Sequence, residues 1–567
     1  MMRSARLRRP AGGWAMAWIA ALLLALLLWS VVYPNASIVV GSFERGLGDW
    51  RDFAASPADR DALWGTILVS IGSVIGALIV GVPLAFLLTR TEFRGRRVLS
   101  GVATLPAALP PLVGVIAFLF LYGESGVVTR VVQHALGLSS APWTFTGLSA
   151  VVFVHAYTMY VYVFLFVSAG LERYDTTLDE AAAGLGASKA LALRRVTLPL
   201  LTPSIAGAML LVFMSALGSF SAPYIFGGGA RVLSTQILVS KLNGAMGLAY
   251  VETTVLAVTA VVALLVLRRL EGRRRYTVAG KGRATRQALR SPVARTLLPF
   301  VAVVVVVLLV LPHAMVVLVS FARDGAWTTQ VLPPEYTLDN YRRLASESAL
   351  WRPITNSVAM GTVSTVANAI VCFAIAYVVV LSRAPGRRAL ALLSALPWAI
   401  PATAIALGLA ATFDRNDPAQ LRVLLVGTFW ILPLAYFIRN IPLVTSAVEG
   451  SLRQMDPTLE DAARGLGASK WLALRRVVIP AARPGLIAGT MLAGVAAVGE
   501  FVASVVLYTH SSRPISVEIL SQIRNTAFGT AAAYSVLLIL LVLVITVGAR
   551  WLEGRFIAGE GVVNAGH

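Results

Sequence analysis

Two charged residues, Arg439 and Glu500, stand inside strongly apolar stretches of this sequence. A charge in such a stretch is costly and usually functional. Aligning the two halves of the chain on the repeat described next places Thr158 opposite Arg439 and Ser219 opposite Glu500, so the first half is neutral at both positions. The pattern predicts either an ion pair between Arg439 and Glu500, with hydroxyls in the first half, or a polar pathway that attracts a cation. A packing corner is the third interpretation, because the neighbouring glycines allow close helix approach.

A second candidate site occurs twice. The copies are Glu180-Ala181-Ala182-Ala183-Gly184-Leu185-Gly186-Ala187-Ser188-Lys189 and Asp461-Ala462-Ala463-Arg464-Gly465-Leu466-Gly467-Ala468-Ser469-Lys470. Carboxylates that open an alanine-rich run complement the positive end of a helix dipole, and the glycines that follow would end that helix. Each copy then continues to a proline, Pro199 or Pro480. We expect a short surface helix, a turn and a second helix in each copy, shaped to fit a partner that is itself two-fold.

The sequence offers no other chemistry. Gly280-Lys281-Gly282 lacks the spacing and the hydroxyl of a phosphate-binding loop, so this run is not expected to bind a nucleotide. The single cysteine, Cys372, excludes an internal disulfide and a cysteine-based metal site. The five histidines have no ligand spacing, and His155 is interpreted as an ordinary interfacial residue. We therefore predict no catalytic residue, no metal site and no cofactor bound by this chain.

Composition indicates the elements that must position these residues. The chain has 567 residues, of which 57% are hydrophobic and 13% charged, and its mean hydropathy is +0.77. Such a chain has too little polar surface for a soluble globule. The net charge of +21 could suggest nucleic acid, but the basic residues form short runs between apolar stretches, as in inner loops of membrane proteins. The lipid bilayer, and no nucleic acid, is the expected surrounding.

Apolar stretches of roughly 20 residues can cross a bilayer as helices. The sequence contains about twelve of them, which predicts an all-α, polytopic membrane protein. They lie near Trp14 to Tyr33, Leu63 to Leu88, Leu99 to Tyr122, Leu148 to Gly170, Leu201 to Phe220, Tyr250 to Leu267, Leu297 to Phe321, Ile354 to Leu381, Ala389 to Phe413, Leu421 to Val444, Gly485 to Leu507 and Ala533 to Trp551.

Charge sets the expected orientation. Four arginines precede the first stretch, which is too long for a typical secretory signal and is interpreted as a retained anchor. Every second loop from there is basic, whereas the first loop on the other side is rich in Asp and Glu. Because basic loops stay inside, we predict a cytoplasmic amino terminus and cytoplasmic positions for both repeated copies.

A second repeat supports two parallel six-helix halves. Leu105-Pro106-Ala107-Ala108-Leu109-Pro110 matches Leu396-Pro397-Trp398-Ala399-Ile400-Pro401, and such prolines bend a membrane helix. We divide the chain into a first half (1–270), a basic cytoplasmic linker (271–296) and a second half (297–567). Residues 172–199 are called the first repeated segment and residues 453–480 the second repeated segment.

The repeated segments resemble the hallmark of the permeases of binding-protein-dependent ABC importers: Glu-Ala-Ala, three residues, Gly, nine residues, Ile-x-Leu-Pro. The first copy matches with Val196-Thr197-Leu198-Pro199 at its end, and the second matches with Asp461 for Glu and Val477-Val478-Ile479-Pro480. The resemblance implies a type I importer permease fold. It assigns coupling to an ATPase to Glu180, Ala181, Ala182, Gly186, Asp461, Ala462, Ala463 and Gly467.

The resemblance also implies partners: two copies of an ABC ATPase subunit, which bind the ATP, and a periplasmic or extracytoplasmic solute-binding protein. The expected place is the bacterial plasma (inner) membrane. Among such permeases, the fused form resembles those for ferric iron and thiamine, and the run from Gly218 to Gly229 favours iron, with thiamine, polyamine or phosphonate as alternatives. A secondary transporter of the major facilitator type is the alternative class, although it would not explain the repeated segments.

Overall fold

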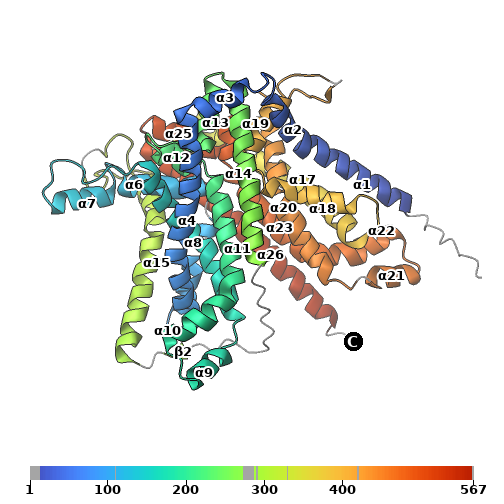
Figure 1. Cartoon of the computed structure of the whole chain (residues 1–567), viewed down its shortest axis with the longest axis horizontal. Coiled ribbons are helices and arrows are strands. Elements are labelled where there is room, and N and C mark those ends of the chain that lie inside the picture. Colours follow the sequence, from blue (N-terminus) through green and yellow to red (C-terminus); the bar gives the residue numbers. More distant parts are fainter. Residues whose placement is uncertain are drawn as a thin grey trace, which may run out of the picture. The chain divides into compact units, whose positions relative to one another are not determined.

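A computed structural model describes residues 13–108, 110–272, 287–288, 291–327, 330–417, 420–456 and 458–564. In these ranges the chain is built from helices (Figure 1), with a single two-residue pairing of β1 (Thr91–Glu92) and β2 (Gln287–Ala288), which run parallel. Eleven helices are long and apolar enough to cross a membrane, and a bent pair makes up to twelve. The predicted all-α membrane fold is confirmed.

The chain forms two compact units. The first-half unit comprises Ser42–Glu347 and Ile519–Leu537. Its helices are α3 (Gly48–Ala55), α4 (Pro57–Arg90), α5 (Arg96–Ala103), η2 (Leu105–Ala108), α6 (Pro111–Tyr122), α7 (Val127–Ala135), α8 (Gly147–Glu172), α9 (Thr177–Gly184), α10 (Lys189–Ala192), η3 (Leu193–Thr197), α11 (Leu198–Leu217), α12 (Ser221–Phe226), α13 (Leu233–Leu242), α14 (Met246–Gly272), α15 (Pro292–Ser320) and α16 (Asp339–Ser346).

The second-half unit comprises Met1–Gly41, Ser348–Glu518 and Leu538–His567. Its helices are α1 (Gly13–Leu27), η1 (Leu28–Val32), α2 (Tyr33–Gly41), α17 (Ser348–Leu381), α18 (Arg387–Ala395), η4 (Leu396–Trp398), α19 (Ala402–Thr412), α20 (Ile431–Gln454), α21 (Thr458–Gly465), α22 (Lys470–Ala473), η6 (Leu474–Val478), α23 (Ile479–Val498) and α24 (Val502–Leu507). Two further helices, α25 (Ile515–Arg524) and α26 (Phe528–Asn564), are divided between the units.

The first helix of each sequence half belongs to the unit of the other half. The α1–α2 segment packs on α18 and α19, and its Tyr33 hydroxyl donates to the Gln420 carbonyl (2.7 Å). In the first-half unit α15 packs on α4, α5 and α6, and Tyr157 donates to the Leu308 carbonyl (2.6 Å). The predicted halves, 1–270 and 297–567, are the two copies of the sequence repeat. The compact units differ from them because each unit contains the first helix of the other half. Residues 273–286 and 289–290 of the predicted linker lie outside the described residues.

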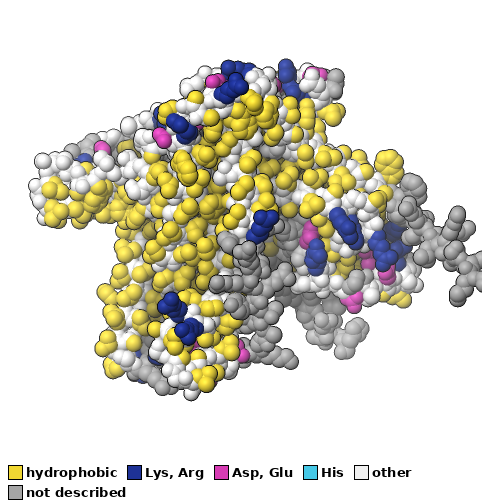
Figure 2. Space-filling view, in the orientation of Figure 1, with side chains coloured by type: hydrophobic (Ala, Val, Ile, Leu, Met, Phe, Trp, Pro, Cys, Tyr) yellow, Lys and Arg dark blue, Asp and Glu magenta, His cyan; other side chains and the backbone are white. Residues whose placement is uncertain are grey.

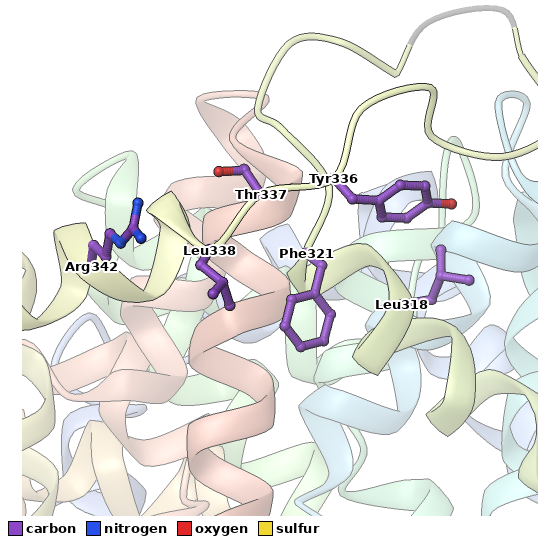
Figure 3. A pocket seen from close by; sticks show the side chains of 6 residues that line it. All are labelled: Leu318, Phe321, Tyr336, Thr337, Leu338 and Arg342. Carbon is purple, nitrogen blue, oxygen red and sulfur yellow. The ribbon is translucent and has the colours of Figure 1, made fainter.

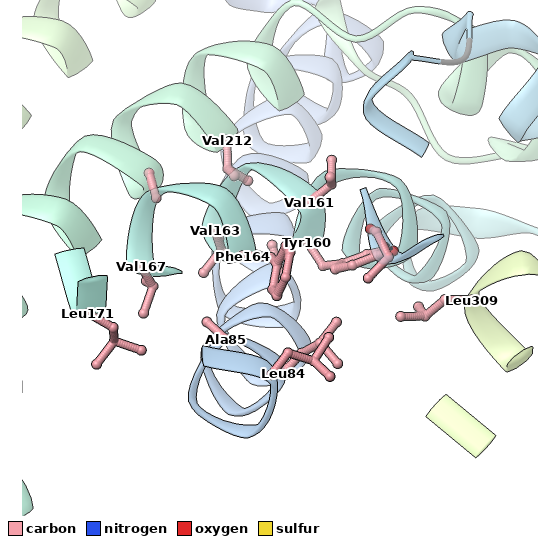
Figure 4. Packing of buried hydrophobic residues seen from close by; sticks show 14 of the residues in the cluster. Leu84, Ala85, Tyr160, Val161, Val163, Phe164, Val167, Leu171, Val212 and Leu309 are labelled. Carbon is pink, nitrogen blue, oxygen red and sulfur yellow. Dashed lines mark hydrogen bonds between the residues drawn. The ribbon is translucent and has the colours of Figure 1, made fainter. Parts of the chain in front are cut away.

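The core of the first-half unit is a cluster shared by α4, α8 and α11. Leu84, Tyr160 and Phe164 point toward one another in this cluster (Figure 4), and Tyr160 satisfies its hydroxyl by donating to the Ala103 carbonyl (2.8 Å). The outward surfaces of α4 and α15 are covered with hydrophobic side chains (Figure 2), among them the exposed Trp64 and Val307. Apolar residues thus face both the core and the surroundings, as a helix in lipid requires.

Several predicted span boundaries are wrong. The apolar stretch predicted from Leu421 to Val444 contains a turn at Gly427 (φ +85°), so α20 begins only at Ile431. The stretch from Ala389 to Phe413 is bent by 107° between η4 and α19. The stretch from Leu99 to Tyr122 breaks at the equivalent position, between η2 and α6. Both breaks coincide with the predicted proline repeat. The first span continues beyond Tyr33 to Gly41.

Candidate functional site

The first repeated segment has the predicted helix, turn and second helix. Helix α9 ends at Gly184, and the Gly186 and Ala187 N–H groups donate back to the carbonyls of Ala183 and Ala182 (2.9 Å each). This pair of bonds satisfies the free carbonyls at a helix end and requires a left-handed residue, which Gly186 provides at φ +82°. The Ser188 hydroxyl then accepts from the N–H of Leu191 (3.3 Å) and starts α10.

The second repeated segment repeats each of these bonds. The Gly467 and Ala468 N–H groups donate to the carbonyls of Arg464 (3.1 Å) and Ala463 (3.0 Å), with Gly467 at φ +91°. A π-helical turn follows in both copies, η3 and η6, before the long helix begins. In Figure 1, α9 lies beside α10 within one unit and α21 beside α22 within the other. Local sequence therefore dictates the same backbone twice.

The residues assigned to coupling lie on the surface of these segments. Glu180, Ala181 and Gly186 are exposed and Ala182 is half-buried; the equivalent Asp461, Ala462, Gly467 and Ala463 show the same pattern. The side chain of the leucine before each turn glycine is almost fully exposed to the surroundings: Leu185 is 90% exposed and Leu466 is 91% exposed. An apolar side chain held this far out is typical of a surface that another protein covers.

Beneath the first repeated segment lies a polar network centred on Asp179. Its carboxylate pairs with the Arg90 guanidinium, and it accepts hydrogen bonds from the hydroxyls of Tyr174 (2.6 Å) and Thr197 (3.1 Å). The Arg90 guanidinium also stacks over the Tyr174 ring, 4.9 Å from its centroid. Burial, together with the hydrogen bond to Asp179, raises the pKa of Tyr174 to about 12, so this phenol stays a donor.

The second repeated segment lacks this network. Glu460 replaces Asp179, and Met455 and Val478 replace the two hydroxyl residues. Helices α4 and α17 are each 34 residues long, so Leu381 is the equivalent of Arg90. Glu460 accepts a hydrogen bond from Tyr377 (3.1 Å) instead. The sequence did not assign Arg90, Tyr174 or Thr197 to a functional site; comparing the two copies position by position is the signal that finds them.

A second polar feature lies where α23 breaks before α24. Arg439 on α20 reaches Glu500 in the break, with 3.3 Å between the guanidinium and the carboxylate. The Glu500 side chain is 10% exposed and that of Arg439 is 33% exposed. Glu500 also accepts from the N–H of Ala503 (3.0 Å), so the carboxylate holds the turn as well as the arginine. The ion pair suggested by the sequence is present; a pathway role for these residues stays a prediction.

In the first half, a histidine bonds to the residue equivalent to Glu500. Thr158 donates to the Val154 carbonyl of its own helix (2.9 Å) and does not pair with Ser219. Ser219 instead lies 2.8 Å from Nε2 of His155, whose Nδ1 lies 2.8 Å from the Ser73 hydroxyl. Because Ser73 donates to a carbonyl of α4, it accepts from Nδ1–H, which leaves Nε2 to accept from Ser219. The 2% exposed His155 thus joins α4, α8 and the break.

The backbone around both breaks is anchored in the same way. In each half, a hydroxyl on the second helix after the break, α13 or α25, donates to the carbonyl of the break residue, and the first N–H of that helix donates to a hydroxyl on the long helix, α4 or α17. These bonds are Ser234 to Ser219 (2.6 Å) and Leu233 to Thr66 (2.8 Å) in the first half, and Ser516 to Glu500 (2.7 Å) and Ile515 to Ser357 (2.8 Å) in the second.

The described residues also form an open pocket of about 510 Å³ at the far end of α15 from β2. Phe321 and Leu318 line it from below, and Tyr336, Thr337, Leu338 and Arg342 from the segment that leads into α16 (Figure 3). None of the residues singled out by the sequence lines this pocket. Within the described part of the chain, no group of His, Cys, Asp and Glu is arranged to hold a metal ion.

Comparison with known proteins decides the family. Residues 77–276 and 369–558 each match the family described as "Binding-protein-dependent transport system inner membrane component". The chain belongs to this family. It is an importer permease with two fused copies of the family's domain, and each copy contains one repeated segment, one proline break and one break after the helix that follows the repeated segment. The match excludes the major facilitator alternative.

Three similar proteins illustrate the range of this permease family. A probable ABC transporter permease protein of Sinorhizobium fredii is 31% identical and covers 82% of the chain and 83% of its own length. The ferric transport system permease protein FbpB of Actinobacillus pleuropneumoniae is 26% identical over 94% of the chain and 77% of its own length. A probable molybdenum ABC transporter permease of Haloferax volcanii is 33% identical over 38% of the chain and 81% of its own length.

Proposed function

We propose that this permease forms the membrane pathway of an ATP-driven importer of ferric iron. Support for iron comes from the relatives named for ferric transport, which match nearly the whole chain. Relatives named for molybdenum match a smaller part of it. Thiamine, polyamine and phosphonate remain the alternatives from the sequence. Selectivity would rest largely with an extracytoplasmic solute-binding protein that delivers the cargo.

The observation that carries the coupling proposal is the pair of exposed helix–turn structures with the same backbone. Each presents a short helix with an acidic first turn, an alanine face and a projecting leucine, Leu185 or Leu466. Two copies of one surface fit two copies of one ATPase subunit. The leucine would fill an apolar cleft of that subunit, and Glu180 or Asp461 would lie at its rim. ATP-driven closure of the two ATPases would then move the two halves as rigid bodies.

The cargo would pass the breaks in α11 and α23. Within the second-half unit, Glu500 would contact the cargo, and Arg439 would hold the Glu500 carboxylate until a cation competes for it; within the first-half unit, Ser219 and Thr158 would take the corresponding role. A carboxylate favours a cationic cargo through simple electrostatic attraction. The amino terminus and both repeated segments would face the cytoplasm, where ATP is present.

Co-purification tests the docking surface. The chain is expressed with its ATPase and solute-binding protein, and the ATPase retained by the tagged permease is measured. Leu185→Asp and Leu466→Asp, which place a charge in an apolar cleft, should each weaken retention by at least about tenfold. Leu242→Asp, at a leucine 74% exposed on α13, is the matched control and should retain the ATPase. Normal retention by both segment variants would contradict the proposed surface.

Uptake into proteoliposomes tests the cargo. Labelled iron, molybdate, thiamine, polyamine and phosphonate are offered in parallel, each with ATP inside and with the binding protein outside. We expect ATP-dependent accumulation of iron only. Absence of iron uptake, with accumulation of another compound, would replace iron and leave the coupling proposal intact.

A further inference from the structure

Asp179 connects the first repeated segment to three separate elements. It lies in the first turn of α9, whereas Arg90 is the last residue of α4, Tyr174 lies in the turn after α8, and Thr197 immediately precedes α11. The connection is shielded from water: Arg90 is 12% exposed, Asp179 21% and Tyr174 1%. A shielded ion pair with further hydrogen bonds resists separation far more than an exposed one does.

The second repeated segment is held to the long helix of its unit more weakly. The bond between Tyr377 and Glu460 joins a neutral donor to a carboxylate that is half-buried, and it involves α17 alone. At the other equivalent positions Met455, Val478 and Leu381 provide no hydrogen-bonding group that could hold Glu460. The exposed surfaces of the two segments share most of their alanines, the turn glycine and the projecting leucine, and they differ at Ala183 and Ala190, which are Arg464 and Trp471 in the second segment. Underneath, the two segments also differ in how each is held to its long helix.

We propose that Arg90 and Asp179, braced by Tyr174 and Thr197, are positioning residues that carry a displacement of the first repeated segment directly into α4 and α11. The first segment is the stiff coupler and the second the compliant one. This inference rests on the proposed coupling function. Any partner that pushes α9 must move α4 with it, whereas α21 can shift while α17 stays in place.

Amide hydrogen exchange of the purified permease in detergent tests, without any partner, how firmly each repeated segment is held to its long helix. Exchange in α9 should be slower than in α21, although the two helices have the same length and the same turn. Asp179→Asn should speed exchange in α9 by about tenfold, whereas Glu460→Gln should change α21 by less than about twofold. Equal exchange in the two helices of the wild-type protein, or equal responses to the two substitutions, would overturn the inference.

Transport per ATP hydrolysed tests the transmission. In proteoliposomes with the ATPase and the iron-loaded binding protein, Asp179→Asn and Arg90→Gln should retain the ATPase but lower the iron imported per ATP by about tenfold. Glu460→Gln is the matched control and should stay within about twofold. Both substitutions remove the same Arg90–Asp179 interaction. The double variant should therefore import as much iron per ATP as either single variant.

The outcomes separate this inference from the proposed function. Additive losses in the double variant, or an unchanged ratio in Asp179→Asn, would overturn the transmission role while the wild-type protein still couples. A wild-type permease that retains no ATPase would instead remove the proposed function, and the exchange measurement would still decide whether the first segment is the stiffer one.

Discussion

The breaks after α11 and α23 share two backbone anchors and differ in their side chains; the Glu500 carbonyl of the second break also accepts from Ser504 (2.7 Å). In both, a serine on the second helix after the break, α13 or α25, donates to the carbonyl of the break residue, and a hydroxyl on the long helix accepts from the N–H that starts α13 or α25. Yet the first break contains the neutral Ser219 with His155, and the second contains the charged Glu500 with Arg439. The duplication has kept the bonds that shape the main chain, while the polar groups that those bonds position have diverged.

Breaking the Arg439–Glu500 ion pair should change the free energy of unfolding more than any other substitution at the two breaks. Arg439→Ala leaves the nearly buried Glu500 carboxylate without a counter-ion, which should lower the free energy of unfolding by about 3 kcal/mol. Chemical unfolding of the permease in detergent micelles measures it. Adding Glu500→Gln to this variant removes the unpaired charge and should recover most of the loss. If the single variant unfolds as the wild type does, the pair contributes nothing to stability.

The histidine of the first half should come next. His155→Ala removes two hydrogen bonds of 2.8 Å and leaves a gap among three elements, so we expect a loss of about 2 kcal/mol in the same unfolding measurement. Thr158→Ala, one turn along α8, is the control; its hydroxyl bonds to its own helix, and its loss should be below about 0.5 kcal/mol. Equal losses in the two variants would mean that the bridge is not an anchor.

The turn glycines should behave alike in the two halves. Gly186→Ala and Gly467→Ala place a side chain at φ +82° and +91°, which should cost about 1 kcal/mol each although both sites have open space around them. Amide exchange in the adjacent short helix should then quicken by about fivefold. Gly184→Ala, inside the helix and equally open, should not quicken it. A response in one half only would show that local backbone geometry does not govern the two turns equally.

The serine anchors should give the smallest effect and the closest agreement. Ser234→Ala and Ser516→Ala each remove one hydroxyl-to-carbonyl bond, of 2.6 Å and 2.7 Å, and should each lower the unfolding free energy by about 0.5 kcal/mol. If the losses of unfolding free energy in the two variants differ by more than about 0.5 kcal/mol, the two serine anchors are not equivalent.

Local patterns in the sequence predicted much of this structure. Apolar stretches gave the spans, and the turn glycines gave the ends of α9 and α21, because each depends on neighbouring residues alone. The Arg439–Glu500 pair could be suggested because two charges in an apolar setting have few other partners. The repeated prolines predicted the positions of the breaks at Leu105 and Leu396, although not the 107° bend of the second.

Contacts between distant residues could not be predicted in this way. His155 meets Ser73, 82 residues earlier, and nothing near either residue indicates the other. The apolar run from Leu421 has the composition of a membrane span, and only the conformation of Gly427 shows that it is a turn. The network at Asp179 joins the end of α4, the turn after α8 and the residue before α11, and it appears as a difference between the two copies only after the fold has placed Arg90 beside Asp179.

The packing of the α1–α2 segment on α18 and α19 bears on how the protein is made. The ribosome delivers this segment long before the residues that hold it: the carbonyl of Leu421, which accepts from the Trp29 indole N–H, lies 392 residues further along the chain. Until then the helix must wait in the bilayer unpartnered, or be shielded by an insertion chaperone. Gene fragments cut at the linker would therefore yield two incomplete products, each carrying a helix that the other needs.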